Sequence, residues 1–161
     1  MKQAIGILLT CLTCTAGFAA SATVGDRVTF TYDDSQWESV RPRPPVGDVL
    51  KIQNAEGDFS VLVMPEKKIS DGLSTPEARR KFIKGLSNVN AQAEDVKPVH
   101  VFEKDGHEFA GTRLVDGVQI RFRIVLIVDA GDVLAIFASS VNEEPMKRPG
   151  IEAVWNSVKI R

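Results

Sequence analysis

Three short turns rich in aspartate and glycine divide the stretch from Val99 to Val141 into four apolar segments. The turns are Asp105-Gly106, Asp116-Gly117 and Asp129 to Asp132, and the segments between them are rich in β-branched residues. Short Asp/Gly turns between such segments are typical of antiparallel strands joined by tight hairpins. The pattern therefore predicts a four-stranded antiparallel meander, which the rest of the chain extends or covers.

The third strand of this meander is expected to be central in its sheet. From Ile124 to Val128 the residues of both faces are apolar, so both faces must be covered. The turn before this strand, Asp116-Gly117, allows two registers. A two-residue loop pairs Leu114 with Gln119, whereas a three-residue loop pairs it with Val118 and keeps apolar residues together. We predict the three-residue loop, which also places three arginines on one sheet face: Arg113, Arg121 and Arg123.

The first 22 residues have the features of a secretory signal peptide. Met1-Lys2-Gln3 is a short positive start, Ala4 to Gly17 is apolar and uncharged, and Ala20-Ser21-Ala22 fits the small-x-small cleavage pattern. An uncleaved membrane anchor is the alternative, but threonines interrupt the segment, and it is short for a span of about 20 residues. We expect cleavage after Ala22 and a single mature domain over residues 23–161.

The composition of the expected mature chain excludes several classes of function. Both cysteines, Cys11 and Cys14, precede residue 23, which excludes disulfides, thiol catalysis and thiolate metal sites. Removal of Lys2 leaves 19 Lys and Arg against 21 Asp and Glu, a net charge of −2. This balance lacks the basic excess of a nucleic-acid-binding domain. No other stretch of the sequence approaches the length of a transmembrane span.

A strand, a loop and a hairpin are predicted before the meander. The alternating segment Arg27 to Tyr32 predicts a strand, and Asp48 to Met64 predicts a hairpin around Asn54 to Gly57. The loop between them contains an aromatic residue, two arginines and successive prolines, which cannot form an interior strand. Such loops often carry contacts. We therefore predict a partner-binding loop at Trp37, Arg41 and Arg43. The alternative is a crossover loop whose tryptophan packs on the core.

Two amphipathic helices are expected to cover the sheet. The first has two candidate starts: Ser74 and Glu77 have capping-box spacing, whereas a Thr75 cap would put Pro76 at the first helical position. The second follows Gly150, and four apolar residues form its stripe: Ile151, Val154, Trp155 and Val158. Strands with two helices and no βαβ alternation indicate an α+β layered domain.

The first helix also carries basic residues away from its apolar stripe. Three of them form a candidate contact with an anionic surface, either lipid or an acidic partner: Arg79, Arg80 and Lys84. A solubilising outer face is the alternative interpretation.

The sequence contains no recognisable catalytic or metal-binding motif. It lacks a Gly-rich phosphate loop, a nucleophile elbow and a zinc-protease helix. A two-residue turn at Asp105-Gly106 separates His100 from His107 by two or three residue pairs, too far to share one metal ion. One histidine with a carboxylate such as Glu103 or Glu108 is the remaining candidate for a weak site. Partly exposed strand histidines are the simpler interpretation, so we predict no catalytic residue, no metal and no cofactor.

The order of the predicted elements is distinctive. An aromatic strand ends in Phe30-Thr31-Tyr32, Trp37 follows, and the chain closes with a helix of the form Ile151-x-x-Val154-Trp155-x-Ser157-Val158. With the hairpin, capped helix and meander between them, this layout over residues 24–160 resembles the PsbP-like α/β/α sandwich superfamily. The resemblance implies an antiparallel sheet covered by two helices and a role in binding rather than catalysis. It implies no functional residue.

These observations predict an exported, non-enzymatic binding or accessory protein of the cell envelope. We expect it in the periplasm, with secretion as the alternative, and with another envelope protein as its partner. No nucleic-acid partner is expected. Two other functions stay open: a small periplasmic enzyme or ligand-binding protein with a His/carboxylate pocket, and a peripheral membrane-surface protein that binds through the basic first helix.

Overall fold

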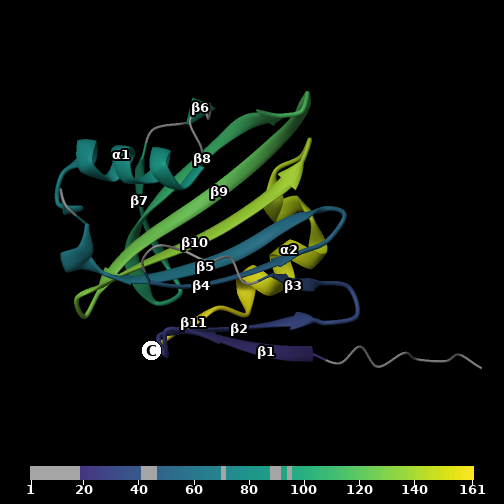
Figure 1. The fold of residues 1–161 in the computed structure, drawn as a ribbon, viewed down its shortest axis with the longest axis horizontal. Helices are drawn as coiled ribbons and strands as arrows, with labels where there is room; N and C mark the ends of the chain where they lie inside the picture. The colour runs from purple at the N-terminus through teal and green to yellow at the C-terminus, as the bar shows by residue number, and fades with distance from the viewer. Residues whose placement is uncertain (1–18, 41–46, 70–71, 88–91, 94–95) are drawn as a thin grey trace, which may run out of the picture.

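The computed structural model describes residues 19–40, 47–69, 72–87, 92–93 and 96–161. Within these ranges the strands form two antiparallel sheets (Figure 1). The smaller sheet has the order β1-β2-β11: Ala19–Val24, Val28–Asp33 and Lys159–Ile160. The larger sheet has the order β3-β4-β5-β10-β9-β8-β6, and β7 also pairs with β8. Its strands are β3 Glu38–Val40, β4 Asp48–Gln53, β5 Gly57–Pro65, β6 Gln92–Ala93, β7 Lys97–Val101, β8 Lys104–Val115, β9 Val118–Asp129 and β10 Asp132–Val141.

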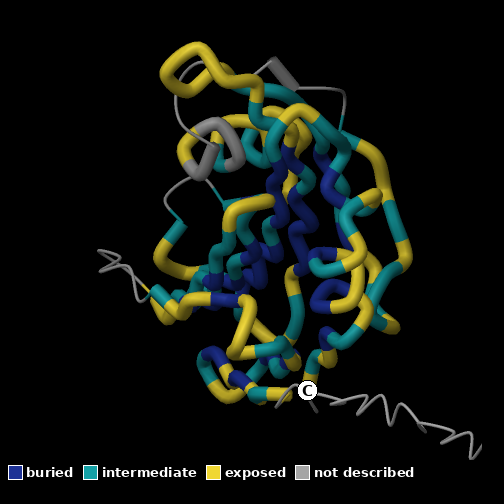
Figure 2. Tube along the Cα trace, turned by 90° about the vertical axis from the view of Figure 1, so that its right-hand side faces the viewer, coloured by how far each residue is buried: buried dark blue, intermediate teal, exposed yellow. Residues whose placement is uncertain are grey.

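The two α-helices lie on opposite faces of the larger sheet. On one face, Phe82 of α1 (Pro76–Ser87) packs on a cluster that includes Phe109 and Phe122. On the other, Trp155 of α2 (Pro149–Asn156) joins the main core, which the smaller sheet closes. Two short 3-10 helices, η1 (Glu66–Lys68) and η2 (Pro145–Lys147), complete the described elements. Figure 2 shows the buried residues inside these layers and the exposed ones at the hairpin ends. The predicted α+β sandwich is confirmed.

Several local predictions are also confirmed. Strand β9 is central, between β8 and β10, and its residues Ile124 to Ile127 are buried on both faces. Of the two predicted starts of α1, the structure has the one with Thr75 as the cap. The Thr75 hydroxyl accepts a hydrogen bond from the Ala78 amide at 3.1 Å. Pro76 therefore occupies the first helical position.

The first turn of the meander lies elsewhere than predicted. The turn is Phe102-Glu103, with φ angles of 54° and 61°, and Asp105-Gly106 lies inside β8. Gly106 is needed there because a Cβ would come within 2.7 Å of the Leu126 carbonyl oxygen of the neighbouring strand. The Phe102 ring anchors the turn instead, with its centroid 5.3 Å from that of Trp155. The glycine therefore serves close strand packing rather than the turn.

The predicted three-residue loop before β9 is also wrong. Val115 pairs with Val118, so Asp116-Gly117 is a two-residue loop, and both of its residues have positive φ angles. The tip of this hairpin is exposed on both faces, with Leu114 71% exposed, so burial does not select the register there. The turn residues select it instead. The shift by one residue moves Arg113 to the α1 face, opposite to the face that carries Arg121 and Arg123.

The expected signal peptide lies mostly outside the described residues. Its last four residues, Ala19 to Ala22, are part of β1 and pair with β2 from Phe30 to Asp33. Ala22 and Val24 are buried in the main core. None of the helices in the described ranges is long and apolar enough to cross a bilayer.

Candidate functional site

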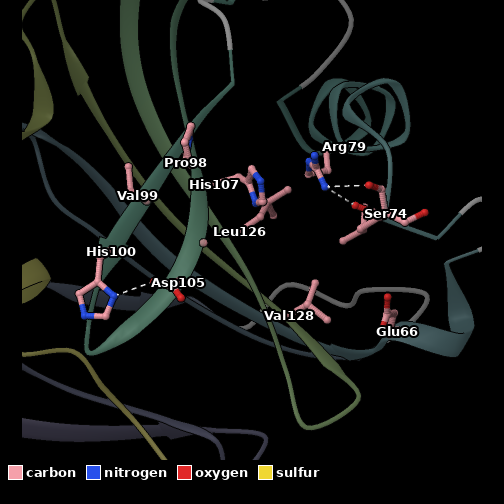
Figure 3. A pocket seen from close by; sticks show the side chains of 12 residues that line it. Glu66, Ser74, Arg79, Pro98, Val99, His100, Asp105, His107, Leu126 and Val128 are labelled. Carbon is pink, nitrogen blue, oxygen red and sulfur yellow. Dashed lines mark hydrogen bonds and ion pairs between the residues drawn. The ribbon is translucent and has the colours of Figure 1, made fainter.

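A pocket of about 650 Å³ lies on the α1 face of the larger sheet. One wall is the β7–β8 hairpin, and the other is the segment around the start of α1, with η1 at one end (Figure 3). The position of the Phe102-Glu103 turn creates the first wall, because it pairs Pro98 with His107 and His100 with Asp105. These four side chains therefore share the face that borders the pocket.

The two histidines have different surroundings within this wall. Nδ1 of His100 lies 2.8 Å from Oδ1 of Asp105, and the two side chains are 69% and 96% exposed. This contact is consequently open to water and contributes little to stability. His107 lies deeper, between Pro98 and Arg79 in Figure 3. Burial, with a smaller effect of the Arg79 charge, lowers the pKa of His107 below its usual value.

Arg79 faces His107 from the opposite wall. Its Nη1 donates hydrogen bonds to the carbonyl oxygens of Leu73 (2.7 Å) and Ser74 (3.2 Å), just before the helix begins. These bonds hold the guanidinium group over the pocket. Among the described residues no carboxylate pairs with Arg79, and its buried Nε has no hydrogen-bond partner. The pocket therefore contains a positive charge that neighbouring side chains do not neutralise.

The floor of the pocket is apolar. Leu73 and Leu126 are buried, whereas Val128 is 47% exposed, an unusual exposure for a valine on a central strand. Glu66 on η1 adds a carboxylate, below Arg79 and Ser74 in the view of Figure 3. An apolar floor with a few polar groups and this volume is typical of sites for small molecules or short chain segments.

The pocket does not contain a recognisable catalytic arrangement. Glu108, one of the carboxylates predicted beside a histidine, lies on the opposite sheet face, where it accepts a hydrogen bond from Nε of Arg123 at 3.0 Å. In the part of the chain that the structure describes, no hydroxyl group is hydrogen-bonded to either histidine. No cluster of three or more potential metal ligands occurs within the same ranges. The groups present can bind and exchange a proton, but none is set up as an activated nucleophile.

The predicted site residues are distributed over different parts of the molecule. Trp37 is only 5% exposed and belongs to the main core, while Arg41 and Arg43 lie outside the described residues. Arg79 borders the pocket, and Arg80 is exposed on α1. The side chain of Lys84 is outside the description. The partner-binding loop and the anionic surface contact therefore stay predictions.

A second hollow borders the Trp37 loop. It has a volume of about 550 Å³, is wide open, and is lined mainly by polar side chains such as Asp34, Gln36 and Asn54. The neighbouring Asp33 accepts hydrogen bonds from the Ser35 hydroxyl and amide and from Gln36, which lower the pKa of its carboxyl group. These bonds stabilise the turn, so Asp33 has a structural role.

The sequence did not reveal that Arg79 and His107 face each other. They are 28 positions apart and belong to different layers, and only the packing of α1 on β8 brings them together. The one available signal was Gly106 directly before His107, since a glycine inside a strand marks a close approach of neighbouring backbones.

Comparison with solved structures identifies the class of fold. The solution structure of the cyanobacterial PsbP protein (CyanoP) from Synechocystis sp. PCC 6803 has a TM-score of 0.63 and 16% identity, covering 97% of this chain and all of that one. A crystal structure from Bacteroides thetaiotaomicron has a TM-score of 0.57 and 12% identity, covering 86% of this chain and 47% of that one. The fold is PsbP-like, as the layout of the sequence predicted. Identities this low establish the fold alone.

Comparison of the sequence with family models and with curated proteins finds no match.

Proposed function

We propose that this protein is exported to the cell envelope and works there as a non-enzymatic binding or accessory protein. The observation that carries the proposal is the pocket between α1 and the β7–β8 hairpin, which combines an apolar floor with the unpaired charge of Arg79. Binding needs only shape and complementary polar groups, and the pocket has both. The fold, which is similar to that of the cyanobacterial PsbP protein, is compatible with this role.

In-cell crosslinking of the tagged, full-length protein tests this function. After fractionation of the cells, crosslinked material is purified and identified by mass spectrometry. We expect the protein in the periplasmic fraction, with one dominant partner that is lost in the double variant Arg79→Gln, His107→Gln. The matched control is Lys81→Gln, which removes one exposed charge from the same helix without touching the pocket.

The same experiment tests the predicted loop separately. The double variant Arg41→Ala, Arg43→Ala leaves the buried Trp37 intact, so a loss of the partner in this variant would report on the loop rather than on core packing. Recovery of the protein only from the cytoplasm would contradict the proposed location. Equal partner yields from the pocket variant, the loop variant and the control would contradict both proposed binding surfaces.

The hydrogen bond between His100 and Asp105 supports a second candidate, a small enzyme. A histidine held by a carboxylate is a common arrangement for a general base. This candidate predicts that the purified protein turns over a substrate and that His100→Gln lowers kcat by about a hundredfold or more while the protein stays folded. Measured turnover that His100→Gln leaves unchanged would remove the pair from the reaction.

A further inference from the structure

We propose that the pocket binds a small organic anion, whose carboxylate or phosphate group lies between Arg79 and His107 and whose apolar part covers Leu73, Leu126 and Val128. This inference rests on the proposed binding function and names the class of its ligand. It follows from three features of the pocket: the charge of Arg79, which no carboxylate pairs with in the described residues, the neutral ring of His107 beside it, and the apolar floor.

The surroundings of Arg79 favour an anion at its side of the pocket, although the whole lining contains two carboxylates and one arginine. Its five titratable groups are Arg79 on α1, Glu66 on η1, and His100, Asp105 and His107 on the hairpin. Nδ1 of His100 already lies 2.8 Å from Asp105, and within the described residues no ion pair joins Glu66 to Arg79. Within the described residues, only backbone carbonyls accept hydrogen bonds from the Arg79 guanidinium. A carboxylate or phosphate is the chemical group that a guanidinium binds best, through two parallel hydrogen bonds.

His107 supplies a second donor that responds to the anion. Its pKa is lowered by burial and by the charge of Arg79, so the ring is neutral at neutral pH when the pocket is empty. An anion beside the ring offsets the repulsion by Arg79 and raises the pKa of His107. Binding is therefore accompanied by proton uptake, and the affinity for the anion must increase as the pH falls.

The floor determines which anions bind well. Leu126 is buried and Val128 is half exposed, and both lie on β9 next to the hairpin wall. An apolar chain placed over them removes apolar surface from water, which contributes about 25 cal/mol for each Å² buried. Inorganic phosphate gains nothing from the floor. An anion with an alkyl chain should therefore bind more tightly than an inorganic one.

Titration of the full domain with four probes tests the inference. The probes are octanoate, octyl phosphate, inorganic phosphate and the uncharged octanol, and binding is followed by calorimetry and by amide NMR shifts. We expect at least one of the two amphiphilic anions to bind at least about tenfold more tightly than octanol and than phosphate, with shifts around residues 73–79 and 105–107. Preference between octanoate and octyl phosphate then distinguishes a carboxylate from a phosphate ligand.

Three variants connect the binding to the named groups. Arg79→Gln is expected to weaken binding at least about tenfold, while Lys81→Gln, a loss of charge on the same helix, stays within about twofold. His107→Gln is expected to remove the increase in octanoate affinity between about pH 8 and pH 6, a range in which octanoate itself stays ionised. The thermal unfolding of each variant shows whether it is folded.

Several outcomes would overturn the inference. Octanol binding as tightly as the anions would show an apolar site without charge recognition. Equal losses in Arg79→Gln and Lys81→Gln would show a diffuse effect of the helix charge. If no probe binds but a crosslinked partner is lost in the pocket variant, the ligand class is wrong and the binding function stands. If neither is observed, both proposals fail.

Discussion

At the scale of single residues, the turn between β7 and β8 places two consecutive non-glycine residues in the left-handed region. Phe102 and Glu103 both have positive φ angles, a conformation that side chains with a Cβ disfavour. Packing of Phe102 on Trp155 holds the turn in place. Glu103 is exposed, and its positive φ angle is one that glycine adopts more easily than glutamate. The register that this turn imposes brings His100, Asp105 and His107 to the pocket.

Glu103→Gly should therefore stabilise the protein. Glycine adopts a φ of 61° without strain, and we expect a gain of about 0.5–1 kcal/mol in the free energy of unfolding, measured with urea. Glu56→Gly is the matched control, because Glu56 also lies in a hairpin turn but has no positive φ angle. A stabilisation of equal size in both variants would contradict the explanation.

The partly buried His107 makes stability depend on pH. Its pKa is lower in the folded protein than the 6.5 of the unfolded chain, so the unfolded chain takes up the proton first as the pH falls. The folded state should lose stability below about pH 6.5, by at most about 1.4 kcal/mol per pH unit from this one group. Urea unfolding at a series of pH values should show that the free energy of unfolding falls less steeply with decreasing pH in His107→Gln than in the unmodified protein. Arg79→Gln should retain most of the slope, because burial is the larger cause.

At the scale of elements, β1 is the strand that the predicted signal-peptide cleavage would shorten. Its six residues pair with β2, and Ala22 and Val24 reach the main core. Cleavage after Ala22, as the sequence predicts, would leave only Thr23 and Val24 in this strand. The edge of β2 from Phe30 to Asp33 would then be unpaired, and unpaired edges invite association with other strands.

A domain that begins at Thr23 should consequently be less stable than one that begins at Ala19. We expect a difference of about 1–3 kcal/mol in the urea unfolding free energy, because four register pairs and the burial of Ala22 are lost. The intact mass of the protein isolated from cells shows which form the cell produces. Equal stability of the two forms would mean that the first four residues of β1 contribute nothing.

At the scale of the whole molecule, one carboxylate connects the two sheets. Asp129, at the turn between β9 and β10, lies 2.5 Å from Nη2 of Arg27 beside the smaller sheet and 3.0 Å from Nζ of Lys104 at the start of β8. All three side chains are partly buried, which reduces screening by water. The contact joins three chain turns that are far apart in sequence.

Asp129→Asn should lower the free energy of unfolding by about 1–2 kcal/mol. The loss should be smaller at about 1 M salt, because salt screens these charges. The control is Asp132→Asn. Within the described residues Asp132 has one ion pair, at 3.5 Å from Nη1 of Arg27. Its loss should lower the free energy of unfolding by about 0.5 kcal/mol or less. Thermal and urea unfolding at low and high salt measure both effects. A larger loss in Asp132→Asn than in Asp129→Asn would contradict the assignment.

The sequence by itself determined β2, the β4–β5 hairpin, the meander strands and both helices, but it did not indicate β1, β3, β6 or β11, nor that β2 lies in a separate, smaller sheet. Hydrophobic periodicity and turn residues are local signals, so β9, the stripe of α2 and the proline at the start of α1 could all be predicted. Packing between distant segments decided the β7–β8 register, whereas the Asp116-Gly117 turn, a local signal, sets the β8–β9 register. The Asp105-Gly106 pattern predicts a turn, but close packing against Leu126 requires Gly106 inside a strand. The pocket depends on that register and on the docking of α1, which places Arg79 opposite His107. Such contacts between distant segments depend on packing in three dimensions, which no local pattern encodes.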